Sequence, residues 1–136
     1  MKYTAFFISM MIFLFPVSED HAFARLSTHP IELYEKGQSL ISTFTGDIDT
    51  LMMAQDVFIV LIEKYPNSPF GYLGMSHLYR IDAHLGEGNY DLTLIQEWAL
   101  PFALKALQLG PSIKAVHENY AFFERFLTDD GNEVKK

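Results

Sequence analysis

Residues that could do chemistry lie in one short stretch of the chain, which contains His77, Asp82 and His84. Imidazole and carboxylate groups are common zinc ligands and common general acids and bases. A metal site needs three or more converging ligands, typically including two histidines four residues apart on a helix. His77 and His84 are seven residues apart, which on one helix separates them by about 10 Å along the axis. We therefore expect an exposed or groove-lining pair of histidines, without a metal or haem.

The remaining sequence offers no catalytic constellation. The chain has no cysteine, which excludes thiolate ligands, cysteine nucleophiles and disulfides. Asp129 and Asp130 fall in a polar C-terminal stretch, where solvent prevents the tuning that acid–base catalysis needs. Gly86-Glu87-Gly88 lacks the strand and the third glycine of a phosphate-binding loop. The sequence thus predicts a protein that is not an enzyme and holds no cofactor.

The charge balance narrows the class of partner. The formal net charge of the 136 residues is −7, and the basic residues form no cluster beyond Lys135-Lys136. Binding to nucleic-acid phosphates requires a basic face. A nucleic-acid partner is therefore not expected.

The N-terminus resembles an export signal. Lys2 precedes an apolar run from Ala5 to Phe15, and Ala22-Phe23-Ala24 has the small-x-small pattern that signal peptidase accepts. The run has eleven residues, whereas a spanning helix needs about 20. We expect residues 1–24 to be a cleaved signal peptide of a periplasmic or secreted protein that has no membrane span afterwards. An uncleaved membrane anchor is the alternative.

Apolar residues in the remaining chain recur at helical spacing, and turn residues separate the blocks. Capping residues and prolines predict where each helix begins. Five helices are expected: one from Pro30 to near Gly46 behind Ser27 and Thr28, one capped by Asp47 or Asp49, one from Ser68-Pro69 to residues 86–89, one from Asp91 to Leu109 with a kink at Pro101, and one capped by Ser112. No window alternates with period two, so a sheet is not expected.

Two of these blocks repeat one another. Pro66 and Pro111 lie 45 residues apart (111 − 66), and an arginine, Arg80 or Arg125, follows each by fourteen residues. A series of large, large-small and large residues also recurs at equal offsets: Tyr72, Met75, Ser76 and Tyr79 follow Pro66, and His117, Tyr120, Ala121 and Glu124 follow Pro111. Three small residues, Ala99, Ala103 and Ala106, precede Pro111.

This order of residues resembles the tetratricopeptide repeat. The resemblance implies an all-α fold in which antiparallel helical hairpins stack as a short right-handed superhelix of about five helices. It places the helical domain at residues 25–127 and leaves 128–136 as a disordered polar tail. The interval of 45 residues exceeds the usual repeat of about 34. We therefore expect both helices of the central repeat to be extended.

The resemblance also implies a binding surface, because such repeats bind proteins on a concave face lined by first-helix residues. Carried over to this chain, that face comprises Phe70, Leu73, His77, Arg80, Ile81, Phe122, Arg125 and Phe126. An apolar set with two arginines suits a peptide or subunit that carries an apolar anchor and a carboxylate. The expected function is an assembly factor or accessory subunit. The alternative for this surface is that the chain's own ends or a second copy cover it.

A second function remains open. The helices could hold a small apolar ligand or haem through Tyr72, Trp98 or His77, which would make the protein a carrier or an enzyme accessory.

Intact-mass spectrometry of the protein from the exported fraction tests the N-terminal prediction. We expect a mature chain that begins at Arg25, because Ala22 and Ala24 fit the small pockets of signal peptidase. A membrane-bound product that retains residues 1–24 would identify an anchored protein instead.

Overall fold

The computed structural model describes residues 29–127, and the signal peptide and polar tail predicted above lie outside them. The helices are α3 (Pro30–Ser42), α4 (Ile48–Lys64), α5 (Pro69–Asp82), α6 (Leu92–Leu94), α7 (Leu100–Leu109) and α8 (Lys114–Glu124), with a π-helical segment η2 (Ile95–Ala99) between α6 and α7. Because α6, η2 and α7 follow without a break, they form one fourth helix. The expected all-α fold of about five helices is confirmed.

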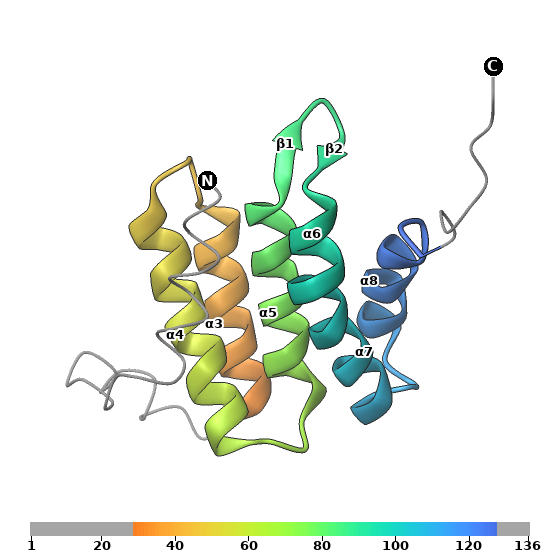
Figure 1. Cartoon of the computed structure of the whole chain (residues 1–136). Coiled ribbons are helices and arrows are strands. Elements are labelled where there is room, and N and C mark those ends of the chain that lie inside the picture. Colours follow the sequence, from red (N-terminus) through yellow and green to blue (C-terminus); the bar gives the residue numbers. More distant parts are fainter. Residues whose placement is uncertain (1–28, 128–136) are drawn as a thin grey trace.

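The helices alternate in direction, as Figure 1 shows. The first, third and fifth helices, α3, α5 and α8, run the same way, and α4 and the α6–η2–α7 helix run back. Each helix packs on the next along the chain, and α5 also contacts α3 and α8. Within residues 29–127, no helix combines the length and the apolar character needed to cross a membrane.

Short polar side chains start three of the helices where the sequence predicts. Asp47 accepts a hydrogen bond from the Thr50 amide, and Ser68 and Asp91 cap α5 and α6 in the same way. The N-terminal caps of the two outer helices, α3 and α8, differ from the prediction. His29 caps α3 through Nδ1, and α8 begins after Ile113 with no side-chain cap. The predicted Ser112 cap is therefore wrong.

The central repeat owes part of its extra length to a small β-hairpin, and not to an extension of α5. Strands β1 (His84–Gly86) and β2 (Asn89–Tyr90) pair antiparallel between α5 and α6. Gly86, Glu87 and Gly88 turn the chain with positive φ angles, which glycine adopts without strain. The expectation of no sheet is thus wrong at this one place, and His84 lies on a strand and not on the helix of His77.

A π-helical segment precedes Pro101 in the fourth helix, where the sequence predicts a kink. Proline has no amide hydrogen, and its ring collides with the carbonyl four residues earlier. Just before it the chain widens into η2, where the Leu100 amide donates to the Ile95 carbonyl five residues back. The π-helical segment accounts for part of the added length between Pro66 and Pro111.

Phe58 lies at the centre of the packing between α3, α4 and α5. Its ring is fully buried, and it contacts two helices at positions without a side chain. A β-carbon on Gly37 of α3 would lie 2.3 Å from the ring, and one on Gly74 of α5 would lie 2.2 Å from it. The two glycines therefore let both helices approach α4 closely.

Replacing Gly74 by alanine tests this close approach. Alanine favours a helix interior by about 1 kcal/mol over glycine, but the added methyl group overlaps the Phe58 ring. We expect Gly74→Ala to lower the free energy of unfolding by about 1–3 kcal/mol, as overpacked cores do. Urea denaturation followed by circular dichroism measures the change.

A double mutant provides the control. Phe58→Leu removes the ring, so Gly74→Ala should cost less in that background than in the wild-type protein. Equal costs in the two backgrounds would contradict the proposed packing.

Candidate functional site

A cavity of about 690 Å³ opens at the end of the molecule where α5 leads into the β-hairpin. Its volume is in the range of small-molecule pockets, about 300–1,000 Å³. The described residues that line it are Phe44, Gly46, Ile48, Leu51, Arg80, Ile81, Asp82, His84 and Tyr90.

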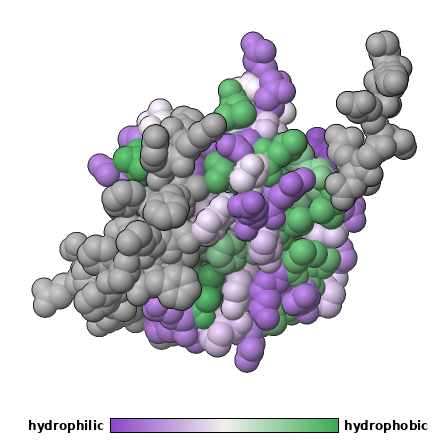
Figure 2. All heavy atoms as spheres, in the orientation of Figure 1, coloured by the Kyte–Doolittle hydropathy of each residue, from purple (hydrophilic) through white to green (hydrophobic). Residues whose placement is uncertain are grey.

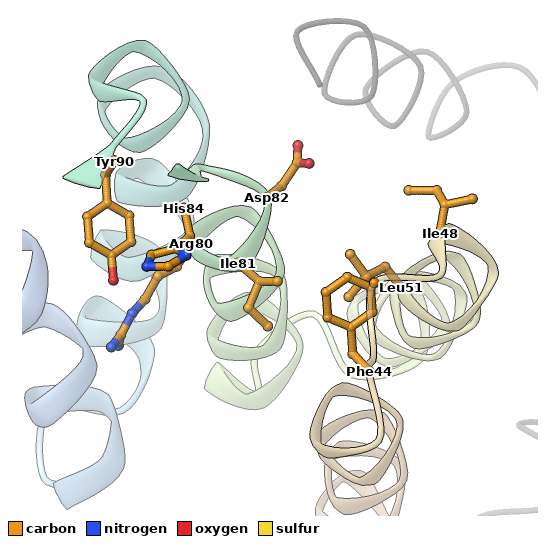
Figure 3. Close-up of a pocket in the computed structure, with 9 residues that line it drawn as sticks. Phe44, Ile48, Leu51, Arg80, Ile81, Asp82, His84 and Tyr90 are labelled. Carbon is orange, nitrogen blue, oxygen red and sulfur yellow. The ribbon is translucent and has the colours of Figure 1, made fainter. Parts of the chain in front are cut away.

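The two sides of this cavity differ in character, as Figure 3 shows. Phe44, Ile48 and Leu51 form an apolar wall at the corner between α3 and α4. The opposite side carries the polar groups of Arg80, His84 and Tyr90, and Ile81 lies between the two sides. The arrangement can accept an apolar group beside charged ones.

Next to the cavity lies a group that we call the arginine–aromatic cluster: Arg80, Tyr90, Phe122, Arg125 and Phe126. The guanidinium carbons of Arg80 and Arg125 lie 3.6 and 4.5 Å from the centroid of the Phe122 ring. The two guanidinium carbons therefore lie no farther from each other than the sum of these two distances. Two cations from different helices thus meet at one aromatic ring, an attraction worth about 0.5–2 kcal/mol per contact.

The β-hairpin completes this cluster from the other side. The Tyr90 ring meets Phe122 and Phe126 edge-on, with centroids 5.2 and 5.6 Å apart. Hydrophilic residues project at the hairpin tip in Figure 2, while hydrophobic ones gather on the side of the view formed by α7 and α8. The base of the hairpin therefore packs on α8 and its tip meets solvent.

Arg80 and Asp82 carry charges that no ion pair with the described residues neutralises. Asp82 is half-buried, and its Oδ2 atom is shielded from solvent without a hydrogen bond from residues 29–127. Burial raises the pKa of this carboxyl above its usual value, and the charge of Asp91 raises it further. Both groups line the cavity, so a ligand there would meet one cation and one under-solvated carboxylate.

His77 connects the three parallel helices and is not exposed. Its Nδ1 atom lies 2.9 Å from Gln38 Nε2 on α3, and the Asn119 amide of α8 donates to the neighbouring Ser76 hydroxyl at 2.8 Å. Burial first, and then the charge of Arg80, lower the pKa of His77 to about 4, and a hydrogen bond with Asn119 opposes this shift. The ring is neutral at pH 7 and links helices.

The structure separates the remaining predicted surface residues. Leu73 is completely buried among Ala106 and Val116, so it is not available to a partner. Phe70 lies near the opposite end of α5, where it packs on Tyr34 with ring centroids 5.2 Å apart. Of the predicted set, the structure therefore brings together Arg80, Phe122, Arg125 and Phe126, with Ile81 beside them in the cavity wall.

Several cavity residues escaped the sequence analysis. Phe44 and Leu51 lie near or within predicted helices and carry no further sequence signal, and the turn residues before Tyr90 predict only the end of a helix. Turn residues at 86–89 followed by an aromatic residue are consistent with a hairpin, and this was the available signal. For Asp82 the sequence offers metal or acid–base chemistry and not a place in the wall of a cavity.

Residues named for a small ligand or haem do not meet in one place. Trp98 packs on Tyr79 of the core with ring centroids 5.8 Å apart, and the Tyr72 hydroxyl donates to the Pro66 carbonyl at 3.3 Å. His77 already engages Gln38. In the part of the chain that the structure describes, no three His, Asp or Glu residues are arranged to hold a metal ion.

Comparison with known proteins gives no independent identification: no family model matches the sequence, and neither a curated protein nor a solved structure matches it.

The pKa of His77 predicts how stability depends on pH. The ordinary pKa of histidine is 6.5 and the pKa of His77 in the folded protein is about 4, so between these pH values the unfolded chain binds a proton that the folded protein does not. The contribution is fully present above pH 6.5 and is lost as the pH falls toward 4. Its size is on the order of 3 kcal/mol.

We expect His77→Gln to remove this part of the pH dependence, as measured by urea denaturation at several pH values. His84→Gln, which changes an exposed histidine at the same end of the molecule, is the matched control and should keep the wild-type profile. An unchanged profile in His77→Gln would assign the dependence to other groups.

Proposed function

We propose that the protein is an exported helical-hairpin interaction module of the tetratricopeptide type, without enzymatic activity. It binds a segment of another protein as an assembly factor or accessory subunit. The alternating helix directions and the parallel arrangement of α3, α5 and α8 support this class. In stacked hairpins, side chains from neighbouring parallel helices form one continuous binding surface.

The observation that carries the proposal is the convergence of Arg80 and Arg125 on Phe122, beside the apolar cavity. Arg80 forms no ion pair with a described residue, and Phe122 and Tyr90 hold the cluster in a fixed arrangement. A guanidinium held in this way binds a carboxylate with little loss of side-chain freedom.

The partner segment accordingly carries a carboxylate and an apolar side chain. The carboxylate binds at Arg80 and Arg125, and the apolar side chain enters the cavity against Phe44 and Leu51. Each charge-assisted contact contributes on the order of 1.5–3 kcal/mol.

A small apolar ligand is the second candidate, and the cavity is the observation that favours it. A volume of about 690 Å³ with Phe44, Ile48, Leu51 and Ile81 in its walls accommodates such a molecule. Native mass spectrometry and solvent extraction of the purified protein separate the two candidates. A stoichiometric bound molecule favours the carrier, and an unliganded protein that binds a partner favours the interaction module.

Charge-removing variants test the role of the arginines. After cross-linking in the exported fraction has identified a partner, we expect Arg80→Gln and Arg125→Gln each to weaken its binding about tenfold. Isothermal titration measures the affinities, and circular dichroism verifies the fold of each variant.

Lys105→Gln is the matched control, because it removes a cation from an exposed position of α7. Its affinity should equal that of the wild-type protein. An unchanged affinity in the folded Arg80→Gln, Arg125→Gln double variant would exclude the arginines from partner binding.

A further inference from the structure

Two opposite charges at the end of α5 face different sides of the cavity. Arg80 and Asp82 are two residues apart, which on a helix places their side chains about 200° apart around the axis. In Figure 3 the Arg80 guanidinium points toward α8, whereas the Asp82 carboxylate lies on the other side of Ile81. The cavity therefore has a positive end and a negative end.

The Asp82 carboxylate has an unmet requirement for a donor. Its Oδ2 atom is inaccessible to solvent and accepts no hydrogen bond from residues 29–127, although a buried carboxylate oxygen without a donor is costly. Arg80, two residues away, is directed to Phe122 and does not form an ion pair with it. A cationic group in the cavity would supply both the missing donor and the opposite charge.

Other charges at this end strengthen the negative side. Asp91 raises the pKa of Asp82 through its own negative charge, and Glu87 is exposed at the hairpin turn. Apart from Arg80, the described cavity lining contains no lysine or arginine. The field on the Asp82 side therefore favours a positively charged group.

We propose that the cavity selects a partner segment by the order of its charges: an acidic side chain at Arg80, an apolar side chain over Ile81, and a lysine or arginine at Asp82. This inference rests on the proposed function and extends it, because the carboxylate contact alone does not fix the direction in which a segment binds. Two contacts of opposite sign do, since reversing the segment places like charges together.

A peptide array provides the probe. It carries nine-residue peptides with a central leucine, in which every flanking position is aspartate, lysine or serine. We expect the labelled wild-type protein to retain peptides with aspartate on one side of the leucine and lysine on the other, in one order only. The retained peptides are then synthesised and titrated in solution.

Asp82→Asn tests the negative end with little change of shape. Peptides that contain the lysine should bind this variant about tenfold more weakly, to the level of their serine counterparts. The preference for aspartate should persist, which also shows that the variant is folded. Glu87→Gln removes a charge at the same end outside the cavity lining and should leave both preferences unchanged.

The outcomes separate this inference from the proposed function. An aspartate preference that depends on Arg80, without any lysine preference or with one that survives Asp82→Asn, would overturn the charge-order proposal alone. An array with no retained peptide would count against both. Loss of the lysine preference in Glu87→Gln as well as in Asp82→Asn would show that a diffuse negative field, and not the Asp82 site, attracts the lysine.

Discussion

The close packing of Phe58 between two glycines is the constraint on which the rest of the structure depends. Because Gly37 and Gly74 have no side chain, α3 and α5 both contact the ring on α4 directly. This contact fixes the corner between α3 and α4 relative to the end of α5. The apolar wall at Phe44 and Leu51 and the charged side of the cavity come from these two places. The distance across the cavity is therefore set in the core and not by the residues that line it.

A second group of aromatic residues holds the charges at the surface. Phe122 receives two guanidinium groups and the edge of Tyr90, so stacking on this ring orders both arginines. Arg80 forms no ion pair with a residue of 29–127. A guanidinium that stacks on a ring keeps its N–H donors at its own edge, so the donors of Arg80 can engage another group. Core packing thus positions the walls, while aromatic contacts position the charges.

The sequence predicted the parts of this arrangement that local chemistry determines. Helix starts at Asp47, Ser68 and Asp91 follow from side-chain capping, and the equal offset of Arg80 and Arg125 from their prolines was sufficient to expect them on neighbouring helices. Leu73 was assigned to the surface because a repeat pattern does not reveal which neighbours cover a given face, here Ala106 and Val116. The β-hairpin and η2 were missed because strands of three and two residues show no periodicity, and one widened helical turn leaves the spacing of apolar residues nearly unchanged.

The π-helical segment has a consequence for the geometry of the whole chain end. A widened turn accommodates one residue more than a regular α-helix of the same length, so the helix before it is rotated by about 100° relative to the helix after it. In this protein the rotated part is α6, which begins two residues after Tyr90, and the part after η2 is α7, which packs on α5 and α8. The orientation of Tyr90 toward Phe122 is therefore coupled to the register of η2. Deleting a single residue between Ile95 and Ala99 would restore a regular α-helix and change by about 100° the rotation of α6, next to the hairpin that carries Tyr90, relative to α7.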